Sequence, residues 1–168
     1  IDDRDQNYFR WAVLAGLRSI DYIASRPEWD GENMAVTGVS QGGALSTMVA
    51  GLDDRITLMS VAHPSHHEHS GNANEVASGW PFYLQQSIER GFSYQGTLNA
   101  TRYYDAINFA KRYEGKVMAF ISYEDEISLA PGIFAAFNHY KNEKILMHWL
   151  DNGHNPNPAE YWNGRYDF

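Results

Sequence analysis

Cysteine is absent from this chain of 168 residues, which excludes disulfide bonds and metal sites built from thiolates. Long apolar runs are absent too, since no segment approaches the roughly 20 consecutive apolar residues of a membrane-spanning helix. Basic residues are few, 13 against 21 acidic ones, and the net charge of −8 weighs against nucleic acid and anionic membranes as partners. The length fits one domain, and the compartment stays open, secreted or cytoplasmic.

Four short apolar segments indicate buried strands, at residues 34–39, 56–62, 116–122 and 144–150. Segments with helical patterns separate them, at residues 5–25, 42–51, 81–90, 100–113 and 132–140, and the tail from Pro158 is expected to form a short helix. Parallel strands covered by helices read as continuous apolar runs, as three of these four do. The order therefore predicts an α/β fold with a mostly parallel sheet and helices on both faces.

The sequence "GVSQGG" stands between the first predicted strand and the helix that follows it. Gly38, Ser40 and Gly42 form the Gly-x-Ser-x-Gly pattern of a nucleophile elbow, a sharp turn that lifts the serine hydroxyl into the open. We expect the two glycines to remove side chains that would collide with the adjoining strand and helix. The backbone N–H of Gln41 would then face a developing oxyanion. The alternative is a strand-to-helix turn without chemistry.

A serine hydroxyl is a poor nucleophile unless a base takes its proton. Two residues offer the rest of a Ser-Asp-His set in the order that α/β-hydrolases use: Asp125 follows the third predicted strand, and His154 follows the fourth. His154 would accept the proton of Ser40, and Asp125 would orient His154. Other acids remain open as alternatives, namely Glu124, Glu126 and Asp151. A structural loop histidine is the alternative for His154.

The sequence "HPSHHEHSG" contains four histidines, at positions 63, 66, 67 and 69. Histidine is the commonest metal ligand among side chains, so a metal site is one interpretation. A polar loop beside the active site is the other, since the spacing differs from that of a helical H-E-x-x-H motif. Trp80, Tyr83 and His69 are candidates for the rim of a substrate site, and packing is their alternative role.

Five segments together resemble the acetyl xylan esterase and cephalosporin C deacetylase family, carbohydrate esterase family seven, within the α/β-hydrolases. They are "RDQNYFRWAVLAGLRSIDYIASRPEWD", "GVSQGG", "TRYYDAINFAKRYEGKV", "DEISLAPGIFAAFN" and "NGHN", and they cover nearly the whole chain. The resemblance maps the nucleophile onto Ser40, the acid onto Asp125 and the base onto His154. Leu129 and Ala130 stand where family members usually carry a Pro-Pro pair.

The resemblance implies a serine esterase that removes acetyl groups from saccharides through an acyl-enzyme. Its chemistry needs no metal and no cofactor, which favours the polar-loop interpretation of the histidines. The implied partners are an acetylated oligosaccharide or polysaccharide and further copies of the chain, because the family often forms closed oligomers. Two alternatives remain: another α/β-hydrolase, such as a peptidase or lipid esterase, and a non-catalytic carbohydrate-binding or assembly fragment.

One helix alone precedes the predicted nucleophile strand, whereas members of the family have several strands there. The family's second oxyanion donor comes from that preceding part. We therefore interpret residues 1–168 as the C-terminal catalytic portion of a single α/β-hydrolase domain, about half of the full fold. The N-terminal half of the hydrolase is then a predicted partner.

Overall fold

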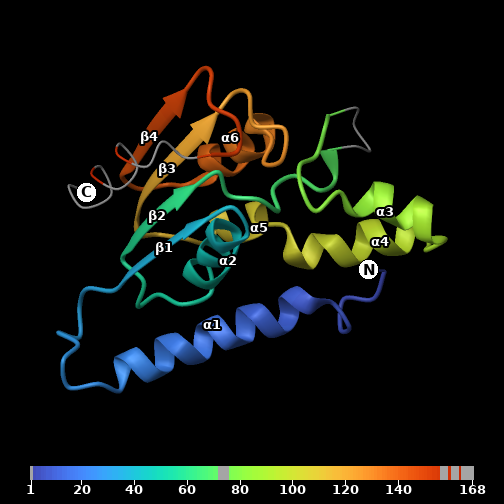
Figure 1. Cartoon of the computed structure of the whole chain (residues 1–168). Helices are drawn as coiled ribbons and strands as arrows, with labels where there is room; N and C mark the ends of the chain where they lie inside the picture. The colour runs from blue at the N-terminus through green and yellow to red at the C-terminus, as the bar shows by residue number, and fades with distance from the viewer. Residues whose placement is uncertain (1, 72–75, 156–158, 160–162, 164–168) are drawn as a thin grey trace.

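The computed structural model describes residues 2–71, 76–155, 159 and 163. Its centre is a parallel four-stranded sheet whose strands lie side by side in chain order (Figure 1), namely β1 (Ala35–Val39), β2 (Leu58–Ala62), β3 (Lys116–Ser122) and β4 (Lys144–Trp149). The register places Val39, Ala62 and Phe120 side by side, so β1 and β2 end level and β3 continues two residues further, to Ser122. All four strand segments expected from the sequence are confirmed, and the α/β fold with them.

Helices connect the strands, in the order α1 (Tyr8–Ala24), α2 (Gln41–Ala50), α3 (Tyr83–Arg90), α4 (Tyr94–Thr101), the short 3₁₀ helix η2 (Arg102–Tyr104), α5 (Ile107–Ala110) and α6 (Ala130–His139). The single helix expected over 100–113 is wrong. Helix α4 begins earlier because the Ser93 side chain caps it, accepting the N–H of Gly96. Extended backbone at Asp105 then separates η2 from α5. The helix expected from Pro158 lies almost entirely outside the described residues.

The main core lies between α2 and one face of the sheet. Ala44 and Met48 of α2 are fully buried and pack in one cluster with Met59, Val61 and Val117 from the strands. Complete burial of a side chain as large as Met48 contributes about 1.5–3 kcal/mol. The opposite face carries a smaller cluster, made of Ala62, Met118 and Phe120 with Val39 and Trp149 packed against it.

The flank formed by α1 and β1 is more open than the rest of the sheet. Among the described strands, β1 pairs with β2 alone, and it is exposed or half-buried along its length. Helix α1 packs against α2 and runs past β1 at the lower side of Figure 1. Its large side chains include Trp11 and Tyr22, which are 61% and 64% exposed. Apolar surface of this kind is typical of a face that another segment covers.

Within the described residues, no helix combines the length and the apolar character that crossing a bilayer requires.

Candidate active site

Ser40 lies in a strained turn between β1 and α2. Its backbone has φ 54° and ψ −120°, a region that costs a residue with a side chain about 1–3 kcal/mol. Two hydrogen bonds to the end of β2 and the loop after it hold the turn there: Ser40 N–H donates to the Ala62 carbonyl at 2.9 Å, and Ser65 N–H donates to the Ser40 carbonyl at 3.1 Å. The turn therefore depends on the end of the neighbouring strand as well as on its own sequence.

The glycines of "GVSQGG" differ in what they provide. A Cβ on Gly38 would lie 2.2 Å from the Gly42 carbonyl oxygen, so a side chain there is excluded. A Cβ on Gly42 would meet open space, so the expected collision at Gly42 is wrong. The close approach occurs one residue later, where a Cβ on Gly43 would lie 2.9 Å from the Pro64 Cβ. The helix thus needs Gly43 to pack against the loop that follows β2.

Ser40, His154 and Asp125 form a continuous chain of hydrogen bonds. Nε2 of His154 lies 2.8 Å from the Ser40 hydroxyl oxygen, and Nδ1 of His154 lies 3.0 and 2.9 Å from the two Asp125 carboxylate oxygens. An ionised carboxylate only accepts hydrogen bonds, so the proton of neutral His154 is on Nδ1. Nε2 then carries the lone pair and can accept the proton of the Ser40 hydroxyl, which is the geometry that a general base requires.

Asp125 is buried, unlike the other acidic residues considered for its role. Its side chain is inaccessible and accepts the backbone N–H groups of Ile127 and Ser128 at 2.9 and 2.8 Å. Burial alone would raise the pKa of this carboxyl, but hydrogen bonds from His63, His154 and the two N–H groups lower the pKa to about 2. The neighbouring alternatives Glu124, Glu126 and Asp151 are exposed.

Gln41 opens helix α2 directly after Ser40, where the first N–H groups of a helix have no partner within the helix. A hollow of about 380 Å³ adjoins it and is lined by Gln6, Asn7, Tyr8, Phe9, Gln41, Trp80, Pro81, Tyr83 and Gln86. Two of the three residues expected on a substrate rim, Trp80 and Tyr83, thus lie beside Gln41.

His69, the third residue expected on the rim, is withdrawn as a substrate contact because its side chain is only 2% exposed. Its ring packs edge-on against the rings of Tyr83 and His66, at centroid distances of 5.0 and 5.5 Å. His66 and His67 are buried as well. The rings of His66 and His69 thus belong to the packing beneath the hollow.

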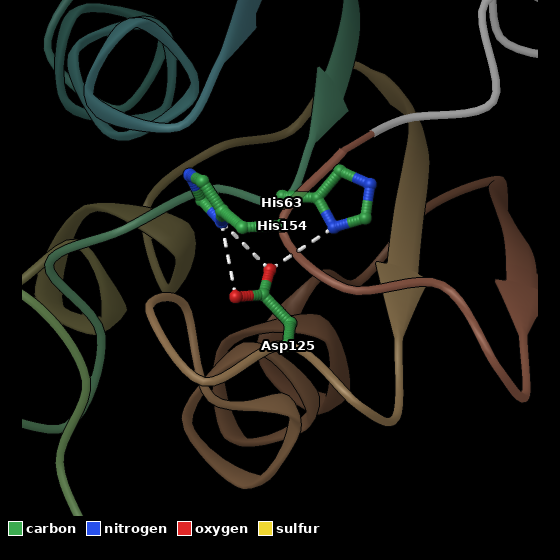
Figure 2. A group of neighbouring side chains, drawn as sticks. All are labelled: His63, Asp125 and His154. Atoms are coloured by element: carbon green, nitrogen blue, oxygen red, sulfur yellow. Dashed lines mark hydrogen bonds and ion pairs between the residues drawn. The ribbon is translucent and has the colours of Figure 1, made fainter.

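His63, the first histidine of this loop, faces Asp125 instead of the hollow. Its Nδ1 lies 3.1 Å from Oδ2 of Asp125. Figure 2 shows the rings of His63 and His154 turned toward the same carboxylate. Atoms of His63, Asp125 and His154 that could ligate a metal lie within 4.8 Å of one another, which is close enough to hold a metal ion. Hydrogen bonds already engage the Nδ1 atoms and both carboxylate oxygens. Sequence reasoning did not place His63 beside Asp125, although its position directly after a strand was a usable signal.

The profile of the acetyl xylan esterase family (AXE1) matches residues 1–165. This chain belongs to that family. Acetyl esterase Axe7A of Xylanibacter ruminicola is 39% identical over 127 residues, which is 76% of this chain and 28% of that protein. Two solved structures are similar over nearly the whole chain. The acetyl xylan esterase from Paenibacillus sp. R4 has a TM-score of 0.85 at 27% identity, with 98% of this chain and 54% of that one covered.

The second solved structure, acetyl xylan esterase 1 from Thermoanaerobacterium sp. JW/SL YS485, has a TM-score of 0.86 at 25% identity. The match covers 99% of this chain and 54% of that one. The family member described here therefore spans about half the length of the solved structures, and a smaller part of the curated relative. Its α/β-hydrolase fold is shared with both structures.

Proposed function

We propose that this chain is the C-terminal catalytic portion of a serine ester hydrolase that removes acetyl groups from saccharides. The observation that carries the proposal is the hydrogen-bonded series Ser40 Oγ, His154 Nε2, His154 Nδ1 and the Asp125 carboxylate. All three residues follow the carboxyl ends of parallel strands, where ligands bind in open α/β sheets.

In the first half of the reaction, the Ser40 oxygen attacks the acetyl carbonyl carbon while His154 Nε2 takes the hydroxyl proton. Asp125 stabilises the resulting imidazolium and keeps its orientation. The carbonyl oxygen becomes negative and accepts a hydrogen bond from the backbone N–H of Gln41, which has no partner within the helix because Gln41 is the first residue of α2. His154 then donates the proton to the leaving sugar oxygen, and acetyl stays on Ser40.

In the second half, a water molecule replaces the sugar. His154 takes a proton from this water, whose oxygen attacks the acetyl-Ser40 carbonyl. Collapse of the second tetrahedral intermediate breaks the bond to the Ser40 oxygen, and the proton on His154 returns to Ser40. The product is acetic acid, which loses its proton to solvent and leaves as acetate, and the starting protonation states of Ser40, His154 and Asp125 are restored.

The saccharide is proposed to bind over the hollow beside Gln41. Aromatic side chains offer large, rigid faces that pack well against the apolar faces of sugar rings. Half-buried Trp80 lines this hollow and is the proposed stacking face, while Tyr83, which is 8% exposed, forms part of the wall behind it. The names of the relatives, acetyl esterase and acetyl xylan esterase, support an acetylated xylan-type saccharide.

An N-terminal half of the hydrolase is proposed to complete the site. One oxyanion donor is available from Gln41, and loss of one of two donors typically costs about 10²–10³ in rate. The unpaired side of β1 and an apolar hollow of about 260 Å³ between α1, β1 and α2 offer the surface against which such a half would pack. Assembly into a homo-oligomer stays a prediction.

The test is acetate release from acetylated xylo-oligosaccharides by the full-length protein, compared with its Ser40→Ala variant. We expect kcat to fall by about 10⁶ in the variant, because nothing else supplies the nucleophile. Ser25→Ala, which removes an exposed hydroxyl at the end of α1, is the matched control and should retain full activity.

Substrate comparison distinguishes the alternatives. Hydrolysis of long-chain acyl esters or of acylated peptides in preference to acetyl saccharides would indicate a lipid esterase or a peptidase. Equal and slow hydrolysis by the wild type and by Ser40→Ala would indicate a non-catalytic carbohydrate-binding or assembly protein.

A further inference from the structure

Each strand of the sheet contributes one residue at its carboxyl end to a single cluster. Ser40 follows β1, His63 follows β2, Asp125 follows β3 and His154 follows β4. The proposed function uses three of them. The fourth, His63, contacts the same Asp125 carboxylate from the other side (Figure 2).

The surroundings of His63 fix its ring in place. The side chain is 0% exposed, and the ring lies nearly parallel to that of Trp149, with 6.2 Å between centroids and 14° between planes. The ring of His154 meets it edge-on at 5.8 Å. The backbone N–H of His63 donates to the Phe120 carbonyl at 2.8 Å. A residue held this closely presents its Nδ1 to Asp125 with little freedom to turn away.

The backbone of His63 is also in an unusual conformation. Its φ is 44°, in the left-handed region that residues with a side chain adopt rarely. Such strain persists only where surrounding contacts fix it, and it concentrates at functional sites. The neighbouring turn at Ser40 has a positive φ as well, and the two turns are joined through the Ala62 carbonyl.

The hydrogen bonds to Asp125 divide between its two oxygens. The backbone N–H groups of Ile127 and Ser128 both donate to Oδ1, whereas His63 donates to Oδ2. His154 Nδ1 is shared between the two oxygens. Among the described residues, Oδ2 therefore receives no backbone N–H, and His63 and His154 are the two donors that share its negative charge.

We propose that His63 is a positioning residue for the catalytic acid, fixing the rotation of the Asp125 carboxylate and sharing the negative charge of that carboxylate with His154. The proposal rests on the proposed function, since it assigns Asp125 as the acid of that reaction. Its physical basis is the donation from Nδ1 to Oδ2, which draws charge from the carboxylate and so weakens its hold on the imidazolium of His154.

Two substitutions of His63 distinguish the effect of its hydrogen-bond donor from the effect of its ring packing. His63→Asn places an amide N–H₂ at the same distance along the side chain as Nδ1, and asparagine tolerates positive φ better than most residues. His63→Phe keeps an aromatic ring beside Trp149 but has no donor. If the hydrogen bond matters, the Asn variant works and the Phe variant fails; if the packing matters, the order reverses.

The first measurement is independent of turnover: NMR titration of the Asp125 carboxyl carbon in wild type and both variants. Loss of a donor to the charged form raises a carboxyl pKa, so the pKa of Asp125 should rise in His63→Phe and stay near the wild-type value in His63→Asn. The titratable groups facing Asp125 from the described residues are His63 and His154, and Glu124 and Glu126 point to solvent.

The second measurement is the kcat and the KM of acetyl ester hydrolysis by the full-length protein. In His63→Phe we expect kcat to fall about 10–100-fold, the effect of losing one hydrogen bond to a charged group, with KM nearly unchanged. The double variant Asp125→Ala/His63→Phe should have the same kcat as Asp125→Ala alone, because His63 acts through Asp125 and has nothing to position once that carboxylate is removed.

His148→Phe is the matched control, since it makes the same substitution at an exposed histidine of β4 and should leave both readouts unchanged. An unchanged pKa of Asp125 in His63→Phe, or equal behaviour of the Phe and Asn variants, would overturn the positioning role. A wild-type protein that does not hydrolyse acetyl esters, but whose Asp125 pKa responds to the Phe variant alone, would overturn the proposed function while supporting the hold of His63 on the Asp125 carboxylate.

Discussion

The carboxyl end of the sheet and the flank formed by α1 and β1 are built in opposite ways. At the sheet end, His63 and Asp125 are almost completely buried, and both oxygens of the carboxylate are engaged. On the flank, Trp11 and Tyr22 are largely exposed and β1 lacks a second neighbour among the described strands. The chain therefore holds the proposed reacting groups firmly while leaving an apolar side uncovered. Positioning of the proposed nucleophile and closure of the fold are separate tasks, assigned to different parts of the molecule.

The sheet end should be the region most sensitive to a change of a few atoms. In Asp125→Asn the amide oxygen is held by the N–H groups of Ile127 and Ser128, which turns its N–H₂ toward His154. That donor favours the tautomer of His154 with hydrogen on Nε2, which cannot accept the Ser40 proton. We expect kcat to fall by about 10⁴, as measured by acetate release.

Glu124→Gln makes the same chemical change at the exposed neighbour and should leave kcat within about twofold of wild type, since surface substitutions are usually near neutral. A loss of less than tenfold in Asp125→Asn would show that another acid orients His154.

The sheet end should also be the acid-sensitive region. Burial lowers the pKa of His67 to about 4 and that of His69 to about 3, and it lowers the pKa of His66 as well. The unfolded chain binds protons at these histidines below about pH 6.5, whereas the folded chain does not until pH falls to those lower values. Stability is therefore full above pH 6.5 and declines toward pH 4, by about 1.4 kcal/mol per pH unit for each histidine.

The measurement is the unfolding free energy between pH 8 and pH 4.5, from denaturant titrations. His69→Phe replaces one of these rings with a ring that takes no proton and should reduce the slope by about 1.4 kcal/mol per pH unit. His139→Phe changes an exposed histidine and should leave the slope unchanged. A stability that stays level from pH 6.5 to pH 4.5 would contradict the assignment.

The flank should show the smallest effect in this chain and a larger one in the full-length protein. Ile23 of α1 is 46% exposed and lines the apolar hollow between α1, β1 and α2. Ile23→Glu should change the unfolding free energy of residues 1–168 by no more than about 0.5 kcal/mol. If an N-terminal half covers this hollow, the same change in the full-length protein buries an unpaired charge and costs several kcal/mol. Equal costs in the two proteins would place that half elsewhere.

The strands and the serine turn could be predicted from the sequence because their signals are local. The segment 116–122 contains its own apolar run and coincides with β3, and the run at 34–39 differs from β1 by one residue. The turn at Ser40 follows from the steric demand on Gly38. Such features need no knowledge of distant segments.

Features that depend on distant contacts could not be predicted. His69 carries the polar character of a surface residue, but the rings of Tyr83 and His66 cover it. His63 and Asp125 are 62 residues apart in sequence, and their contact requires the pairing of β2 with β3 and a left-handed residue at the end of β2. The choice of Asp125 over Glu124 came from resemblance to the family, since composition alone does not separate neighbouring acids.

The joining of Ser40 to the end of β2 has a consequence for how the protein is made. A chain leaving the ribosome exposes Ser40 before residues 62–65, which bind its N–H and carbonyl, and long before His154, which lies 114 residues further along. On the proposed function, Ser40 stays an unactivated alcohol until β4 and the loop that carries His154 have docked. Labelling by a fluorophosphonate, which modifies activated serines, would therefore report when His154 reaches Ser40.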